Sequence, residues 1–275
     1  MPSLVGSEMC IRDRYNTVIK ADEITAVRGT QEGMAHLGMA ILNPGDVVLL
    51  PDPGYPVFEA GSYLGGAEVY YYPLLRENNF LPVIEDIPED VLNKTKYIVL
   101  SYPSNPVGAS APKEMYVRMI EYAKKYNFAI INDNAYSDII FDGREGFSFL
   151  SLPGAKDVGV EFFSLSKSYN VTGLRISFCI GNKSIIDAFK LLRSQYDFGM
   201  SYPAQKAAIA ALRGPRDSVK AQCAEYQRRR DALLNGLRKY GWNVPDSHGT
   251  MFVWLPVPEG YTSASFTCLL YTSDA

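Results

Sequence analysis

The sequence has little cysteine and no long apolar run. The four cysteines of its 275 residues lie far apart and form no CxxC pair: Cys10, Cys179, Cys223 and Cys268. This spacing indicates neither a disulfide framework nor a zinc site, so we expect no metal and a reducing compartment. No apolar run approaches the ~20 residues that span a bilayer, and residues 1–14 lack the continuous apolar centre of a signal peptide. We therefore predict a cytoplasmic protein that does not enter a membrane.

The sequence also lacks a strong excess of charge. Its 27 Lys and Arg residues are interspersed with 30 Asp and Glu residues, which gives a net charge of −3. The basic stripe that nucleic-acid binding leaves in a sequence is therefore missing. Hydrophobic residues make up 47% of the chain, which is ample for a packed core at this length. Small molecules, and not nucleic acids, are the expected partners of a globular protein of this kind.

The two ends of the sequence differ from the rest. "SLVGSEMCIRDR" near the start and "CLLYTSDA" at the close resemble translated sequencing-adapter read-through. We therefore expect residues 1–14 and 268–275 to be non-native.

Between these ends the chain alternates helical and strand patterns. Apolar residues recur at helical spacing in segments such as 31–42 and 111–126. Apolar runs that end in, or begin from, polar residues occur at 47–50, 97–106, 128–136, 161–167 and 174–182. This pattern is typical of an α/β protein with a mainly parallel sheet and helices on both faces. From about residue 183 the chain is predicted to be helical, and 249–257 is predicted to begin a further strand.

Ligands of such sheets bind beyond the carboxyl ends of the strands, so we expect the polar residues there to gather in one crevice. The candidates for this site are Thr30, Gln31, Tyr55, Asn105, Asp133, Tyr136, Ser164, Ser166, Lys167 and Arg175. Thr30 and Gln31 open a helix, where free N–H groups and the helix dipole favour an anion. Arg175 offers a planar fork suited to phosphate oxygens, and the two serines add hydroxyl donors. Three separate segments thus favour one phosphate group.

The other candidates favour an aromatic ring and an aldehyde. A buried carboxylate at Asp133 needs a cationic partner, for which a protonated ring nitrogen would serve. Tyr55 could stack on the ring, while Asn105 and Tyr136 could hydrogen-bond a ring oxygen. The amine of Lys167 could form a Schiff base with an aldehyde. A phosphate, a basic ring nitrogen, a ring hydroxyl and an aldehyde together describe pyridoxal 5′-phosphate (PLP).

Several motifs carry a resemblance to a known family. "SLSKSYNVTGLR" resembles the SxSKxxxxxGxR signature of the class I/II aminotransferases of fold type I, "SNPVG" their NPTG motif, and "DNAYSDIIFDG" their D-x-A-Y strand end. The resemblance runs from about residue 20 to 265. Segments such as "GTQEGMAHL" and "LPGAKDVGVEFFSLSK" are more narrowly similar to the LL-diaminopimelate aminotransferases. "NPVG" and "GLRIS" depart from the family's NPTG and GxRxG, but neither change removes a reacting group.

The resemblance implies a role for each candidate. Lys167 would form the internal aldimine with PLP and then shuttle the substrate Cα proton, and Asp133 would keep the pyridine nitrogen protonated. The other eight candidates would hold the ring and the phosphate. Members of the family are longer two-domain subunits that form homodimers. We therefore expect a large PLP-binding domain over 15–215, part of a small domain over 216–267, and no activity from the 275-residue chain alone.

The implied function is transfer of an amino group between an amino acid, with LL-diaminopimelate as the first candidate, and 2-oxoglutarate. A PLP-dependent C–S β-lyase of the same fold and a non-catalytic PLP-binding sensor module are the alternatives. Each residue by itself also has an ordinary explanation: Lys167 as a solvated loop charge, Ser164 and Ser166 as turn or capping residues, and Asp133 as a helix cap. The order and spacing of the whole set favour the site.

Overall fold

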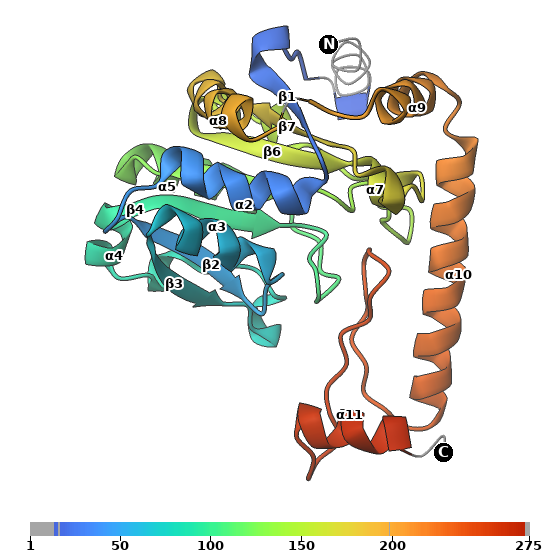
Figure 1. Cartoon of the computed structure of the whole chain (residues 1–275). Coiled ribbons are helices and arrows are strands. Elements are labelled where there is room, and N and C mark those ends of the chain that lie inside the picture. Colours follow the sequence, from blue (N-terminus) through green and yellow to red (C-terminus); the bar gives the residue numbers. More distant parts are fainter. Residues whose placement is uncertain (1–13, 16, 198, 273–275) are drawn as a thin grey trace.

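The computed structural model describes residues 14, 15, 17–197 and 199–272, and its centre is a seven-stranded sheet (Figure 1). The strands are β1 (Ile24–Val27), β2 (Val47–Asp52), β3 (Glu68–Pro73), β4 (Thr95–Ser101), β5 (Ala129–Asp133), β6 (Gly159–Ser164) and β7 (Ser177–Gly181). They lie in the order β1-β7-β6-β5-β4-β2-β3. Strands β2 to β6 are parallel to their neighbours in that set, whereas β7 is antiparallel to both β6 and β1. The mainly parallel α/β sheet predicted from the sequence is confirmed.

Helices cover both faces of this sheet (Figure 1). The longer ones that pack on it are α2 (Thr30–Ile41), α3 (Val57–Gly65), α5 (Lys113–Tyr126) and α8 (Lys183–Tyr196). On β2, Val48 and Leu50 belong to one core with residues of α2, α3 and α8, while Val47 and Leu49 belong to another core with residues of α5. Successive strand side chains point to opposite faces, so a strand buried on both sides is apolar throughout. This explains the unbroken apolar runs of the sequence.

Further helical segments connect these elements. They are α4 (Glu89–Lys94), α6 (Ala155–Val158), α7 (Leu165–Ser168) and α9 (Tyr202–Arg213), with 3₁₀ turns η1 (Ala21–Glu23), η2 (Arg76–Asn78), η3 (Ile84–Asp86), η4 (Phe149–Ser151) and η5 (Thr172–Leu174). Within the described ranges, no helix is both long and apolar enough to cross a membrane.

The long helix α10 (Asp217–Lys239) stands beside the sheet and leads to α11 (Ser263–Thr272) at the far end of the molecule (Figure 1). Between them, residues 245–252 return to the sheet as a segment that we call the return loop. Its His248 N–H donates to the Gly108 carbonyl at 3.0 Å, and its Thr250 N–H donates to the Ile139 carbonyl at 2.9 Å. The loop is therefore fastened to segments that follow β4 and β5.

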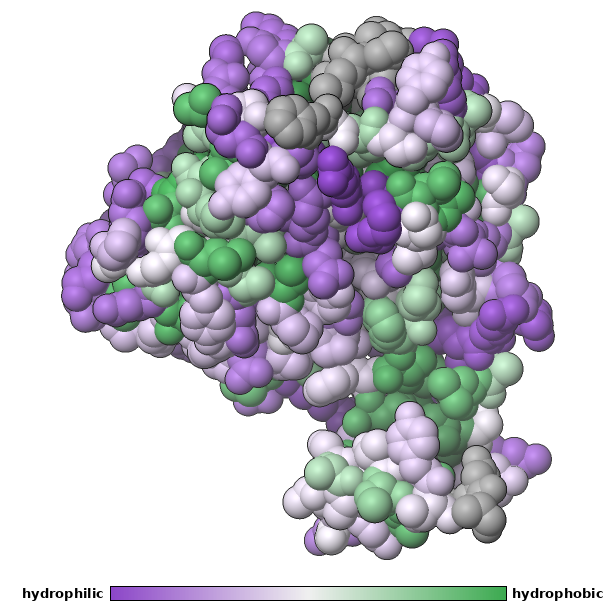
Figure 2. Space-filling view, in the orientation of Figure 1, coloured by the Kyte–Doolittle hydropathy of each residue, from purple (hydrophilic) through white to green (hydrophobic). Residues whose placement is uncertain are grey.

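The prediction of a strand over 249–257 is wrong for the structure described. Only an isolated bridge joins Gly249 to Ile140, and residues 251–257 are not in a strand. A strand needs a continuous hydrogen-bonding neighbour, and among the described residues the backbone pairing of this segment does not extend past Thr250. The stretch leaves apolar side chains exposed, such as Met251 at 39%, and Figure 2 shows apolar surface in that part of the molecule. Of the predicted non-native ends, 1–13 and 273–275 lie outside the described residues, and 268–272 form the last part of α11.

Candidate active site

A cavity of about 280 Å³ lies at the carboxyl edge of the parallel strands. The ten residues predicted from the sequence all line it: Thr30, Gln31, Tyr55, Asn105, Asp133, Tyr136, Ser164, Ser166, Lys167 and Arg175. Gly29, Ala135, Thr172 and Phe252 complete the lining. The structure thus brings the whole predicted set to one place and adds a wall from the return loop.

Strand direction explains this convergence. Strands β5 and β6 run parallel and end at Asp133 and Ser164, so both residues reach the same edge of the sheet. Strand β7 runs the opposite way, and its first residue, Ser177, pairs with Ser164. Arg175 precedes β7 and therefore arrives at the end of β6, although it stands at the start of its own apolar run.

The N-terminus of α2 forms one end of the cavity. Gly29 caps the helix with φ +93°, and no side chain occupies the cap, so backbone N–H groups of the first turn are open to a ligand. An added Cβ on Gly29 would lie 2.8 Å from Cζ of Arg175 and closer still to Nη2. The Nη1 group of Arg175 donates to the Thr172 carbonyl at 3.0 Å. Gly29 therefore allows a helix terminus and a guanidinium to meet, which is an anion-binding arrangement.

Ser164 and Ser166 lie between this end and Lys167. The Oγ of Ser164 accepts the Ser166 N–H at 3.1 Å as the N-cap of α7, and the Ser177 hydroxyl donates to the same oxygen at 3.0 Å. The capping role considered from the sequence is therefore present. Because two donors use the lone pairs of this oxygen, its own O–H proton remains available to donate to a ligand.

Lys167 lies in α7, half-buried, with its carbonyl accepting the Gln222 side-chain amide at 2.7 Å. This contact ties α7 to α10. The Lys167 ammonium forms no ion pair with any residue that the structure describes. Its amine is thus presented to the cavity without a competing carboxylate.

Asp133 is the buried acid of the site, with 8% of its surface exposed. Its Oδ1 accepts the Ala135 N–H at 3.2 Å, and burial raises the pKa of its carboxyl to about 6. No described Lys, Arg or His forms an ion pair with it. Burial, followed by the charge of Asp133, raises the pKa of the Tyr136 phenol well above its usual range, so Tyr136 stays a hydrogen-bond donor at neutral pH. In the described part of the chain, no group of three or more His, Cys, Asp or Glu residues is placed to bind a metal ion.

Two aromatic residues, Tyr55 and Phe252, complete the walls of the cavity. The hydroxyl of Tyr55 donates to Gln31 Oε1 at 3.4 Å, which places this tyrosine near the α2 terminus. The ring of Phe252 meets that of Tyr136 edge-on, with centroids 5.7 Å apart. Sequence reasoning missed Phe252 because it lies 116 residues after Tyr136 in a run that was predicted to be a strand. Thr172 could have been found, since it is a polar residue between Lys167 and Arg175.

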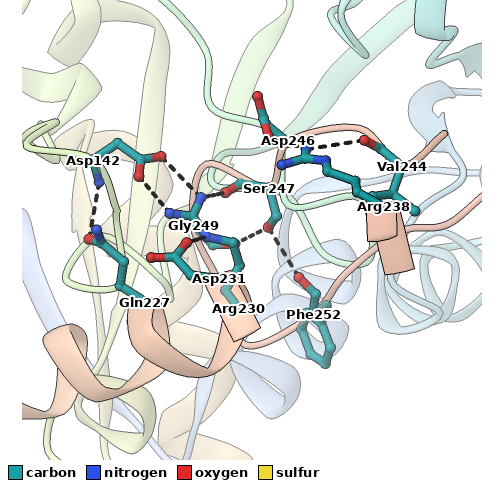
Figure 3. Close-up of polar contacts among 10 residues, drawn as sticks. All are labelled: Asp142, Gln227, Arg230, Asp231, Arg238, Val244, Asp246, Ser247, Gly249 and Phe252. Carbon is teal, nitrogen blue, oxygen red and sulfur yellow. Dashed lines mark hydrogen bonds and ion pairs between the residues drawn. The ribbon is translucent and has the colours of Figure 1, made fainter. Parts of the chain in front are cut away.

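Figure 3 shows what holds the return loop in place. Arg230 of α10 donates to both carboxylate oxygens of Asp142, at 3.0 and 2.5 Å, and to the Ser247 carbonyl at 2.5 Å. The Ser247 hydroxyl in turn contacts the Phe252 carbonyl at 3.1 Å. The Arg230 side chain is 8% exposed, and its hydrogen bonds, together with its charge, hold the pKa of Asp142 below its usual range. A buried guanidinium therefore fastens the loop that carries Phe252.

Comparison with known proteins agrees with this arrangement. The family model for aminotransferase class I and II matches residues 6–270. An LL-diaminopimelate aminotransferase of Dehalococcoides mccartyi is 48% identical over 92% of this chain and 66% of its own length. The corresponding protein of Halothermothrix orenii is 42% identical over 93% of this chain and, again, 66% of its own length. The chain thus spans about two thirds of these curated relatives.

Solved structures show the same fold. Substrate-bound BacF of Bacillus subtilis superposes with a TM-score of 0.95 at 35% identity, covering 99% of this chain and 70% of BacF. An aminotransferase of Staphylococcus aureus gives a TM-score of 0.94 at 35% identity, covering 98% of this chain and 71% of its own. From its motifs, its fold and these matches, the chain belongs to the class I and II aminotransferase family.

Proposed function

We propose that this protein is a PLP-dependent aminotransferase whose active site is the cavity described above. Class I and II aminotransferases use PLP as their cofactor. The observation that carries the proposal is the presence in one cavity of an unpaired, half-buried Lys167 amine and a buried Asp133 carboxylate without a cationic side-chain partner among the described residues. These two groups match the aldehyde and the basic ring nitrogen of PLP.

The phosphate end of the cavity fits the cofactor. The α2 N-terminus at Gly29, the Arg175 guanidinium and the hydroxyls of Ser164 and Ser166 supply donors from three segments. The positive φ of Gly29 and the closeness of Arg175 leave no room for a side chain there. A dianionic phosphate would bind through backbone N–H groups and a planar fork, which is a favourable combination.

The other end of the cavity fits the pyridine ring of the cofactor. The carboxylate of Asp133 would bind the proton on the ring nitrogen, and that cation would lower a pKa that burial raises to about 6. Tyr136 would donate to the ring oxygen together with Asn105, and Tyr55 would lie against the ring. Phe252 closes the cavity beside Tyr136 and helps to exclude water.

Bound PLP supplies an electron sink that stabilises negative charge at the substrate Cα. Lys167, which lines the cavity, would hold the cofactor through its Nζ, where the aldehyde would be bound. With a substrate bound, Lys167 Nζ would take the proton from the substrate Cα and later return it. The Asp133 carboxylate would stay hydrogen-bonded to the proton on the ring nitrogen throughout. Arg175 and the serines hold the phosphate so that the ring does not move.

We propose LL-diaminopimelate as the amino donor and 2-oxoglutarate as the acceptor. The support is the 40–48% identity to the LL-diaminopimelate aminotransferases. We also propose that residues 15–215 form the cofactor-binding domain, that 216–267 belong to a second domain, and that the protein acts as a homodimer.

Borohydride reduction tests the proposal directly. After incubation of the protein with PLP and reduction, peptide mapping should find the pyridoxyl group on Lys167, and Lys167→Arg should abolish the label. Lys156, which binds Glu23 at 2.7 Å, should stay unlabelled. A label on another lysine, or none, would contradict the site. In a protein of the relatives' full length, assays with LL-diaminopimelate and 2-oxoglutarate should yield glutamate, whereas pyruvate from a cysteine conjugate would favour the β-lyase.

A further inference from the structure

A second buried carboxylate lies directly behind the cavity. Glu161 is a β6 residue with 0% of its surface exposed, and it pairs with Asn132 of β5. On β5, Ile130 packs in the core that contains α5 residues, and Ile131 packs in the core that contains α2 and α8 residues. Since side chains alternate along a strand, Asn132 lies on the α5 face, opposite to Asp133. Glu161 therefore lies across the sheet from the cavity.

Four hydrogen-bond donors surround this carboxylate. The side-chain amides of Asn132 and Asn134 both donate to Oε1 at 2.8 Å, and the Phe149 N–H donates to the same oxygen at 3.3 Å. The Ser148 hydroxyl donates to Oε2. Ser148 also accepts the Leu150 N–H, which leaves its proton for Glu161. All four groups act as donors, so the arrangement is built for an ionised carboxylate.

Two of these donors flank Asp133 in the chain. Asn132 and Asn134 stand immediately before and after it, and both bind the same oxygen of Glu161. The Asn132 amide is oriented by the Tyr116 hydroxyl, which donates to its Oδ1 at 3.0 Å. The Asn134 amide also donates to the Phe147 carbonyl at 3.0 Å. One carboxylate thus fixes the backbone on both sides of the residue that faces the cavity.

This arrangement has an energetic cost that a neutral core would avoid. Burial raises the pKa of Glu161 to about 7 against the effect of its donors, and none of the described cations forms an ion pair with it. A buried charge without a cation is unfavourable unless hydrogen bonds compensate. Hydrogen bonds to a charged group are about twice as strong as neutral ones. When Glu161 is ionised, its hydrogen bonds to Asn132 and Asn134 are therefore stronger than those of a neutral amide would be.

We propose that Glu161 is a positioning residue, which holds Asp133 toward the cavity by binding Asn132 and Asn134 on the opposite face of the sheet. In functional terms this rests on the proposed PLP chemistry, because Asp133 matters only if it meets the ring nitrogen. The placement itself is a property of the protein alone and can be measured without cofactor. Glu161 touches neither cofactor nor substrate.

The first measurement is a titration of Asp133 in the cofactor-free full chain. The Ala135 amide, which donates to Asp133 Oδ1, reports this carboxyl through its NMR chemical shift, with a midpoint expected near 6. In Glu161→Gln and Asn134→Ala the loosened carboxyl should turn toward water in the cavity, and the midpoint should fall toward the ordinary value of about 3.9. The ionisable groups around Asp133 are Tyr55, Tyr136, Lys167 and Arg175 in the cavity and Tyr116 and Glu161 across the sheet.

Tyr72→Phe is the matched control. It removes a buried hydrogen bond of the same sheet, from the Tyr72 hydroxyl to the Val99 carbonyl at 2.6 Å, and should lower stability without moving the Ala135 midpoint. If Glu161→Gln and Asn134→Ala also keep the midpoint, the positioning role is wrong and Glu161 is only structural. If Glu161→Gln shifts it but Asn134→Ala does not, the charge of Glu161 acts by itself, and positioning is again excluded.

The second measurement adds PLP labelled with ¹⁵N at the ring nitrogen. The wild type should show a protonated nitrogen, and both variants should bind PLP about tenfold more weakly, the equivalent of one lost hydrogen bond to a charged group. The ¹⁵N chemical shift of PLP bound to these variants should move toward that of an unprotonated ring nitrogen. A wild type that binds no PLP would overturn the proposed function, while the Ala135 titration would still decide the role of Glu161.

Discussion

Replacing Gly29 with alanine is the sharpest test of the phosphate end of the cavity. Gly29 has φ +93° and ψ 152°, a region that is essentially restricted to glycine. Its added Cβ would lie 2.8 Å from Cζ of Arg175 and closer to Nη2, so the guanidinium must move. The change therefore has two separable consequences, one for the backbone and one for Arg175.

The magnitudes follow from these two parts. Holding alanine in this conformation costs about 1–3 kcal/mol of folding stability. Moving Arg175 off the phosphate loses a hydrogen bond between charged groups, about 1.5–3 kcal/mol, which is about 10- to 100-fold in PLP affinity. Gly45→Ala is the matched control, because Gly45 has φ +91° but nothing within 4 Å of the added Cβ. It should lose stability without losing affinity for PLP.

The assay is a PLP titration followed by absorbance, beside urea unfolding of each variant. Gly29→Ala combined with Arg175→Ala should bind PLP no more weakly than Arg175→Ala alone, because the same contact is lost once. The reasoning is refuted if Gly29→Ala binds PLP as tightly as the wild type, or if Gly45→Ala weakens binding to the same extent.

Three further predictions concern Asp133, Arg230 and Glu161. In a protein of the relatives' full length, Asp133→Ala should lower turnover at least about 10²-fold but weaken PLP binding far less, because the phosphate contacts remain. Kinetics beside a PLP titration check this, and near-normal turnover would refute the role. Arg230→Lys keeps the charge but loses the two hydrogen bonds to the Asp142 carboxylate, so the backbone amides of the return loop should exchange hydrogen about tenfold faster. The control is Arg229→Lys, because the ion pair of Arg229 with Glu225 is exposed. Equal protection in the two variants would contradict the role of Arg230 in holding the loop. Because burial raises the folded-state pKa of Asp133 to about 6 and of Glu161 to about 7, the cofactor-free protein binds more protons folded than unfolded. Its stability should therefore fall by about 3 kcal/mol per group as pH rises from about 4 to about 7. Glu161→Gln should remove about half of this slope in urea unfolding, and a stability that rises over the window would contradict it.

The sequence by itself was enough to predict the α/β class and ten of the fourteen residues that line the cavity. Apolar runs without alternation report strands buried on both faces, and the carboxyl ends of parallel strands share one edge of a sheet. Asp133 and Ser164 follow from this rule directly. Lys167 and Arg175 follow because they lie within one short connection between two runs. These inferences need only local patterns and the geometry of a parallel sheet.

Only the tertiary structure decided the neighbours that come from far along the chain. The antiparallel direction of β7, the arrival of Phe252 at Tyr136, and the binding of both Asn132 and Asn134 by Glu161 all depend on which strands and loops pair. Glu161 was visible in the sequence as the first residue of the run 161–167, but its four donors were not. Local patterns record whether a side chain is buried and which backbone shape it prefers. They do not record which distant group fills the other side of a contact, because that is set by packing the whole chain. For the same reason 249–257 has the pattern of a strand, although among the described residues its β-pairing is limited to the bridge from Gly249 to Ile140.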